Sequence, residues 1–263
     1  MLNEKMSSEF REKIIVSFIS GKGAIGKSVI LSLIARVLVE DFSKILIWDN
    51  DIFSPIQHFI NNVEPNIRLV DVLENNLPIN KALTKINERI SLIGGGINKL
   101  DFNPEISDML IKKFVELMKE HDFDIVFIDN HSGFSKTIVD FCKISSLNLM
   151  FLSDDPTSVL DAYGLTKILY KAFSINNIAT IVNNVIDKED GMEILKVFNL
   201  ATTNFLKKEF PNVGIIYYEK ELKKHLLYQD LFAQTKNNAE FIQNIRNISN
   251  NIINFVLKHQ RVV

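Results

Sequence analysis

The chain has 263 residues, of which 46% are hydrophobic, and it carries 30 basic against 32 acidic side chains. This length and apolar content predict a single large α/β domain over residues 1–263 with a substantial buried core. The near balance of charge excludes a global field toward nucleic acid or anionic lipid, so nucleic acid is not an expected partner. A single cysteine, Cys142, excludes an internal disulfide framework and a multi-cysteine metal site. With no secretory signal in the sequence, we expect a cytoplasmic protein.

Short apolar runs alternate along the chain with longer segments of helical periodicity, which is the βαβα pattern. The predicted strands are Ile14–Ile19, Ile45–Trp48, Ile90–Ile93, Ile125–Ile128, Leu147–Leu152 and Ile178–Val182. The predicted helices are Lys27–Glu40, Ile106–Glu120, Ser158–Phe173, Met192–Lys208 and Ala239 to about His259. Most of these strands are apolar without alternation, so we expect a doubly wound, mostly parallel sheet with helices on both faces. Functional residues of such sheets follow the carboxyl ends of the strands.

A glycine-rich stretch, "SGKGAIGKS" from Ser20 to Ser28, lies directly after the first predicted strand and before the first predicted helix. It satisfies the pattern G-x-x-x-x-G-K-[ST], in which loop amides and a helix N-terminus cradle nucleotide phosphates. Lys27 is expected to reach the β- and γ-phosphates, and the Ser28 hydroxyl is expected to hold Mg²⁺. The predicted phosphate-binding residues are Gly21, Lys22, Gly23, Ala24, Ile25, Gly26, Lys27 and Ser28.

Carboxylates stand at the ends of the second and fourth predicted strands. Asp129 closes the apolar run "DIVFID", which is the place of a Walker-B acid in the Mg²⁺ shell. Asp49 and Asp51 occur two residues apart in "WDND", so both are expected to face the γ-phosphate, one of them orienting the attacking water. For Asp49, the alternative is a purely structural cap. The following "NHSG" predicts a flexible segment that senses the γ-phosphate, in which His131 is either catalytic or incidental.

The stretch "GKGAIGKS" resembles the deviant Walker A motif K-G-G-x-G-K-[ST] of the MinD/ParA class of P-loop ATPases. Lys22 falls on the signature lysine, which in that class crosses an ATP-sandwiched dimer to contact the partner's nucleotide. The resemblance implies ATP and Mg²⁺ as cofactors, a homodimer when ATP is bound, and slow hydrolysis coupled to dimerisation. The catalytic residues that it implies are Lys22, Lys27 and Asp51, where Asp51 orients the water. The metal-binding residues that it implies are Ser28, Asp49 and Asp129.

The resemblance continues over roughly residues 14 to 235. "DND" is similar to the switch I motif D-x-D, "FIDNHSG" to switch II, and "VNN" to a V-N-R motif, which implies that Asn183 contacts adenine. "LIGGG", "DFDIVFIDNHSGFS" and "DDPTSVLDAYGLTKIL" look most like FlhG, also called FleN or YlxH, within the class. That similarity implies control of flagellar number and placement, with FlhF or flagellar basal-body proteins as partners.

The sequence departs from the family pattern at four places. Ala24 stands where the motif has glycine, so a left-handed backbone there would carry strain. Tyr217, in "GIIYYEKEL", replaces the proline of a G-x-I-P-x-D segment, and Asn184 replaces an arginine. The segment before the first strand, "MLNEKMSSEFREK", does not contain the D-Q-A-x-x-L-R motif by which many FlhG proteins activate FlhF.

The last predicted helix, within residues 239–263, is amphipathic. Its apolar stripe comprises Phe241, Ile245, Ile248, Ile252 and Phe255, and Lys258 and Arg261 lie near its end. We favour core packing for this stripe. The alternative, taken from MinD and FlhG, is a weak peripheral contact with the inner face of the cell membrane, supported by dimer avidity.

Other functions remain open at the level of sequence. One alternative is a MinD/ParA-type positioning or partition ATPase; chromosome or plasmid partition normally needs a basic DNA-binding surface, and the sequence shows none. A metabolic P-loop enzyme would need a cluster of polar substrate-binding residues outside the phosphate loops. A scaffold that binds nucleotide without turnover is a third alternative, which Ala24 and Tyr217 keep open. The iron–sulfur carriers of the class use paired cysteines, so one cysteine disfavours them.

Overall fold

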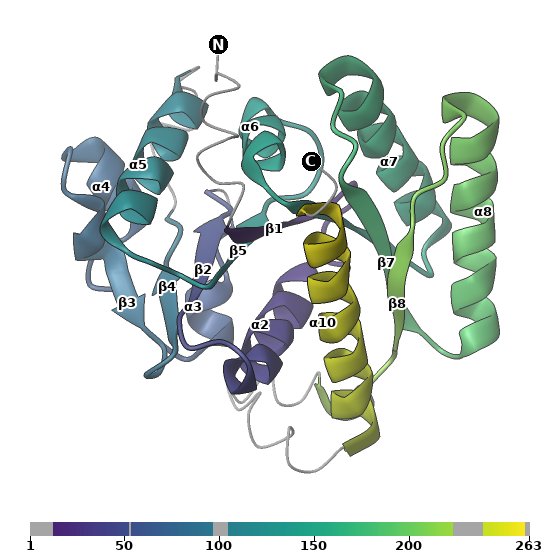
Figure 1. Ribbon diagram of the computed structural model, residues 1–263, viewed down its shortest axis with the longest axis horizontal. Coiled ribbons are helices and arrows are strands. Elements are labelled where there is room, and N and C mark those ends of the chain that lie inside the picture. Colours follow the sequence, from purple (N-terminus) through teal and green to yellow (C-terminus); the bar gives the residue numbers. More distant parts are fainter. Residues whose placement is uncertain (1–12, 53, 97–104, 223–238, 261–263) are drawn as a thin grey trace.

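The computed structural model describes residues 13–52, 54–96, 105–222 and 239–260. Its centre is an eight-stranded sheet with the strand order β3-β4-β2-β5-β1-β6-β7-β8 (Figure 1). The strands are β1 (Ile14–Ser20), β2 (Ile45–Asn50), β3 (Leu83–Lys85), β4 (Ile90–Ile93), β5 (Ile125–Asn130), β6 (Leu147–Ser153), β7 (Ile178–Val185) and β8 (Asn212–Tyr217). Only the pair β3–β4 is antiparallel within this sheet. The predicted doubly wound, mostly parallel α/β sheet is confirmed.

Helices cover both faces of the sheet. The α-helices of the described chain are α2 (Lys27–Val37), α3 (Gln57–Ile60), α4 (Leu69–Glu74), α5 (Ile106–Glu120), α6 (Lys136–Ile144), α7 (Pro156–Lys167), α8 (Lys188–Leu206) and α10 (Ala239–Gln260). Helices α2 and α10 pack side by side on one face, whereas α5, α6, α7 and α8 cover the other (Figure 1). Short 3₁₀ segments, Leu38–Glu40 and Ile79–Ala82, and a π-helical turn, Ile168–Ala172, extend these elements.

Strand β1 shows why the central strands are apolar throughout. Val16 and Phe18 point into the core cluster that contains α2 and α10, and Ile15 and Ile19 point into the clusters on the opposite face. All four side chains are fully buried, because successive residues of a strand face opposite sides and both sides are covered. The buried strand order fixes which strand ends lie next to each other at the carboxyl edge.

Two strands and three helices were not predicted. Strand β3 has three residues, and β8 has exposed residues at both ends, Asn212 and Tyr217, and a half-buried glycine, Gly214, so neither shows a buried apolar run. Helices α3, α4 and α6 have four, six and nine residues, which is too short for a clear helical period. Both edge strands owe their structure to pairing with a buried neighbour.

Helix α10 buries the apolar stripe that the sequence shows. Ile245 and Ile252 are fully buried, and Ile248 lies so close to β8 that a Cβ on Gly214 would sit 2.4 Å from its Cγ1. The stripe continues through Val256, which is fully buried, rather than through Phe255, which is half-buried. Core packing is confirmed for the described part of the helix, so this face does not point outward.

No helix of the described ranges is long and apolar enough to cross a membrane. Two features of the sequence, Arg261 and the segment 1–12 that lacks the D-Q-A-x-x-L-R motif, lie outside the described residues.

Candidate nucleotide-binding site

The loop between β1 and α2 is folded tightly around its glycines. Gly26 has φ of 82° and Ala24 has φ of 60°, so both adopt the left-handed conformation. A Cβ on Gly21 would lie 2.3 Å from the backbone carbon of Asp161 in α7, which leaves no room for a side chain. Gly26 precedes the first residue of α2, so the first amide groups of that helix face the loop. Amides and the helix dipole together favour an anion at this point.

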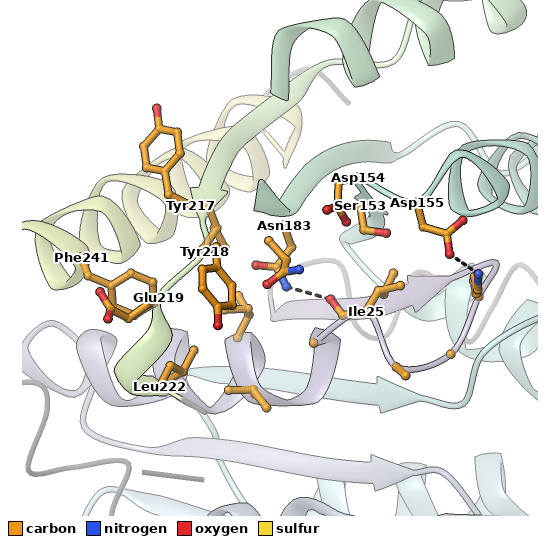
Figure 2. A pocket seen from close by; sticks show the side chains of 18 residues that line it. Ile25, Ser153, Asp154, Asp155, Asn183, Tyr217, Tyr218, Glu219, Leu222 and Phe241 are labelled. Atoms are coloured by element: carbon orange, nitrogen blue, oxygen red, sulfur yellow. Dashed lines mark hydrogen bonds and ion pairs between the residues drawn. The ribbon is translucent and has the colours of Figure 1, made fainter. Parts of the chain in front are cut away.

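A cavity of about 510 Å³ opens beside this loop. Its lining comes from the loop itself, from α2, and from the carboxyl ends of β6, β7 and β8 (Figure 2). The ring of Tyr218 lies between Asn183 and Phe241 in Figure 2, whereas that of Tyr217 points away from them, so the part of the cavity away from the loop is lined by aromatic and amide groups. The volume falls in the range of small-molecule sites, and the phosphate loop at one end and an apolar wall at the other suit a nucleotide.

Lys27 is buried at the foot of the loop. Its ammonium group donates to Oδ1 of Asp129 and to the carbonyl oxygen of Asn130, at the end of β5. The structure therefore brings together two residues that were predicted for phosphate and for Mg²⁺. In this arrangement Lys27 supplies the positive charge beside the Asp129 carboxylate.

The two carboxylates at the ends of β2 and β5 are direct neighbours. Asp49 and Asp129 are register partners across the two strands and are almost completely buried. Burial, and then the charge of Asp129, raise the pKa of Asp49 well above its usual value. Two buried carboxylates of this kind fit a site for a divalent cation, which would relieve both effects.

Ser28 completes the residues predicted for Mg²⁺. Its carbonyl oxygen and Oδ2 of Asp129 accept hydrogen bonds from the same amide group, Nε2 of Gln57, at 3.0 and 2.7 Å. Within the described residues, no group of three or more His, Cys, Asp or Glu side chains could hold a metal ion. The two carboxylates, with the Ser28 hydroxyl as predicted from the sequence, would suit Mg²⁺, which usually keeps waters and shares phosphate oxygens.

Asp51 folds the segment that follows β2. Its backbone N–H donates to Oδ1 of Asp49 at 3.2 Å, and its own Oδ1 accepts from the backbone N–H of Ser54 at 2.8 Å. Asp51 thus lies next to the buried carboxylates and is only half-buried. Asp49 also has part of the structural role that was its alternative, because its carboxylate caps the following segment by accepting hydrogen bonds from the backbone N–H groups of Asp51 and Gln57.

Lys22 is held by the first turn of α7 in its own chain. Its ammonium group forms an ion pair with Asp155 and donates to Oγ1 of Thr157 at 2.7 Å. Hydrogen bonds from Lys22 and Thr157 lower the pKa of Asp155 below its usual value. The side chains of Lys22 and Asp155 are 37% and 40% exposed, so solvent screens this pair and it is easily opened.

Asn183 lines the cavity but uses its amide donor within the protein. Nδ2 of Asn183 donates to the carbonyl oxygen of Ile25 at 2.7 Å, as the dashed line in Figure 2 shows. A Cβ on Gly26 would lie 2.6 Å from this nitrogen, so Gly26 leaves room for the contact. The structure places Asn183 against the phosphate loop, next to Ile25, which is itself buried.

His131 has both ring nitrogens engaged in the segment after β5. One lies 2.8 Å from the carbonyl oxygen of Ser132 and the other lies 2.8 Å from Oγ of Ser135. These contacts fold the turn before α6, in which Gly133 has φ of 83°. They give His131 a local structural role.

The comparisons with known proteins agree with this geometry. Antiactivator FleN of Pseudomonas aeruginosa is 21% identical over 234 residues, which cover 86% of this chain and 83% of FleN. The flagellum site-determining protein YlxH of Helicobacter pylori is 24% identical over 239 residues, which cover 89% of this chain and 80% of YlxH. No protein-family model matches the chain.

Solved structures show the same fold. The cell division ATPase MinD of Pyrococcus furiosus superposes with a TM-score of 0.72 at 18% identity, covering 92% of this chain and 98% of that chain. MinD of Pyrococcus horikoshii, solved with Mg-ADP, has a TM-score of 0.69 at 18% identity and covers 90% of this chain and 94% of its own. The chain is of the MinD/ParA type in fold and similar to FlhG-type proteins in sequence.

Two residues of this site were missed by sequence reasoning. Asp155 occurs in the quoted stretch "DDPTSVLDAY", where an acid directly before a proline is a typical helix start, and it caps α7 by accepting from Thr157 N–H at 2.8 Å. Gln57 lies in a segment without a motif, and nothing in the sequence indicates its burial. Both residues contact side chains that the motifs did identify.

Proposed function

We propose that the chain is an ATP-dependent dimerising switch ATPase that controls flagellar number or placement. The observation that carries this proposal is the convergence of a two-lysine phosphate loop with the buried Asp49–Asp129 pair at one edge of the sheet. The similarity to FleN and YlxH supports the flagellar role. The solved structures of similar fold, one named an ATPase and one solved with Mg-ADP, support the choice of ligand.

The loop residues would bind and orient the phosphates of ATP. Backbone amides from Gly21 to Ser28 would donate to the phosphate oxygens. The ammonium group of Lys27 would leave Asp129 and contact the β- and γ-phosphates. Ser28, Asp49 and Asp129 would hold Mg²⁺, which supplies positive charge to the phosphates. Asp51, next to these carboxylates, would orient the attacking water.

Lys22 would link nucleotide binding to assembly. In the structure it pairs with Asp155 of its own chain, so reaching a second nucleotide across a dimer requires that this ion pair open. The γ-phosphates of two facing nucleotides are a stronger attraction for an ammonium group than one half-exposed carboxylate. Dimerisation would therefore depend on ATP.

The partners that we propose are a second copy of the chain and, through the flagellar similarity, FlhF or basal-body proteins. The proposed location is the cytoplasm. Membrane contact through the apolar stripe of α10 is left out of the proposal, because Ile245, Ile248 and Ile252 are buried in the core.

The first test is ATP turnover by the purified chain with Mg²⁺. We expect ATP hydrolysis, and we expect Asp51→Ala to lower it by about 100-fold or more while ATP binding is retained, since a group that positions or activates water contributes about that much. Asp41→Ala is the matched control, because Asp41 is an exposed acid in a turn before β2. Equal turnover by wild type and Asp51→Ala would contradict the role of Asp51, and a wild type that binds no ATP would contradict the function.

A further inference from the structure

Gln57 contacts all three residues that we assign to Mg²⁺. Its side chain is fully buried at the start of α3. Nε2 donates to Oδ2 of Asp129 at 2.7 Å and to the carbonyl oxygen of Ser28 at 3.0 Å, and the backbone N–H donates to Oδ2 of Asp49 at 3.1 Å. One residue from the segment after Asp51 therefore connects two strands and the phosphate loop.

The orientation of the Gln57 amide is fixed by its neighbours. Oε1 accepts a hydrogen bond from Oγ of Ser32 at 2.7 Å and another from Nδ2 of Asn61 at 3.1 Å. A flipped amide would place its NH₂ group against these donors and its oxygen against the Asp129 carboxylate. The network thus requires that the donor face Asp129.

The chain of hydrogen bonds continues to a cation. One guanidinium nitrogen of Arg36, in the last turn of α2, donates to Oδ1 of Asn61 at 3.1 Å. Asn61 donates to Gln57, and Gln57 donates to Asp129, so every bond runs from the cation toward the carboxylate. Hydrogen bonds aligned in this way polarise and strengthen one another in a buried site.

The bond from Gln57 becomes decisive when Lys27 moves. In the structure, Lys27 holds Oδ1 of Asp129 and Gln57 holds Oδ2. Binding of ATP, as proposed above, draws Lys27 toward the phosphates and frees Oδ1. Gln57 is then the contact that keeps the carboxylate oriented, because Asp129 is buried and a buried carboxylate is costly to leave without a donor.

We propose that Gln57 is a positioning residue of the magnesium site and that the relay from Arg36 through Asn61 to Gln57 holds the Asp129 carboxylate in the orientation that Mg²⁺ requires. Gln57 does not touch the nucleotide and acts through Asp129. This inference rests on the proposed function, since it concerns the same site. It also ties helix α3, and with it the segment after Asp51, to the occupancy of that site.

The test compares Gln57→Leu with a control variant that also replaces a buried amide side chain by leucine, far from the site. Leucine keeps the volume but removes every side-chain hydrogen bond. The control is Asn148→Leu, because Asn148 is also fully buried and its Nδ2 donates at 3.1 Å to the Cys142 carbonyl and at 3.0 Å to Asn177, away from the loop. For each protein, binding of a fluorescent ATP analogue is titrated in EDTA and at increasing Mg²⁺, and the melting temperature is recorded.

We expect Gln57→Leu to bind the analogue in EDTA as wild type does and to need about 10- to 100-fold more Mg²⁺ for half of the magnesium-dependent gain in affinity, as for other residues that orient a metal ligand. Asn148→Leu is expected to lower the melting temperature and leave the Mg²⁺ titration unchanged. A purely structural role of Gln57 would give the same pattern as Asn148.

Each outcome separates the inference from the proposed function. If wild type shows magnesium-dependent binding and Gln57→Leu superposes on it, the inference is overturned and the function stands. If wild type itself shows no such binding, both are overturned. If Gln57→Leu does not fold, Ser32→Ala decides, because it removes one of the two donors that orient the amide: a shift to higher Mg²⁺ supports the inference, and an unchanged titration overturns it.

Discussion

Ala24, which stands where the family motif has glycine, carries backbone strain. Its φ of 60° lies in the left-handed region, which costs a residue with a Cβ about 1–2 kcal/mol. Glycine would remove that cost, but it would also stabilise the unfolded state by about 0.4–1 kcal/mol through its larger conformational entropy. Ala24→Gly should therefore raise the free energy of unfolding by about 0.5–1 kcal/mol. Urea unfolding measures the change. Ser174 is exposed and has φ of 57°, so Ser174→Gly should give a similar gain. If Ala24→Gly lowers the free energy of unfolding instead, Ala24 is not strained.

The Lys22–Asp155 ion pair must open before Lys22 can reach a second nucleotide, so its strength should affect how easily the dimer forms. Asp155→Asn keeps a side chain that caps α7 but removes the charge that holds Lys22. Solvent weakens this exposed ion pair, and each dimer would open two of them, so without it the ATP-dependent dimer should dissociate at about two- to ten-fold lower protein concentration. Analytical ultracentrifugation with ATP and Mg²⁺ measures this. Asp161→Asn makes the same change of charge at an exposed residue of α7 outside the cavity and should have no such effect, and an equal effect of both variants contradicts the specific role of Asp155.

The identities of site residues were more predictable than their contacts. The spacing of the phosphate loop predicted Lys27, and the resemblance to the MinD/ParA class added Lys22 and Asn183. The partners of these residues come from sequence positions more than 100 residues away, and Asn183 turns its amide donor toward Ile25. Gln57 carried no signal at all, since a polar residue in an irregular segment is usually exposed and its burial depends on the packing of α3 against α2.

The burial of helix α10 predicts which of its side chains stabilise the fold. Ile252 is fully buried between α2 and the sheet, so Ile252→Ala should lower the free energy of unfolding by about 2–5 kcal/mol. Leu257, on the same helix but 38% exposed, is the control, and Leu257→Ala should change it by no more than about 0.5 kcal/mol. Chemical denaturation measures both. A small effect of Ile252→Ala, together with loss of liposome sedimentation, would contradict core packing and support a membrane-binding face.

The elements predicted from sequence are those with a buried apolar run or a long amphipathic period. Strand β4 and helix α5 have the predicted bounds, because their ends coincide with the ends of the apolar pattern. Strands β2 and β5 run two residues further than predicted, so Asp49 and Asp129 lie inside the strand ends and pair in register. Hydrophobicity does not reveal this extension, because the last residues are polar and are held by their ladder hydrogen bonds.

The whole molecule brings distant segments to one edge of the sheet. The phosphate loop follows β1, the carboxylates lie near the ends of β2 and β5, and Asn183 lies in β7, so all of them meet at one edge of the sheet. The loop and Asn183 line the cavity, whereas Asp49 and Asp129 are buried beneath the loop and do not line it. The strand order explains this convergence: β1 lies between β5 and β6, and β7 pairs with β6. A sequence predicts that such an edge exists, whereas the order of the strands along it follows from the three-dimensional fold.

The central claim is that ATP makes this chain dimerise through Lys22, and size-exclusion chromatography with light scattering tests it most directly. With ATP and Mg²⁺, Asp51→Ala should accumulate as a dimer, because it binds ATP and keeps Lys22 but leaves the water unoriented. Lys22→Ala should bind ATP through Lys27 and the loop amides and remain a monomer with no turnover. A Lys22→Ala protein that elutes as a dimer and hydrolyses ATP at a near-normal rate would contradict the claim.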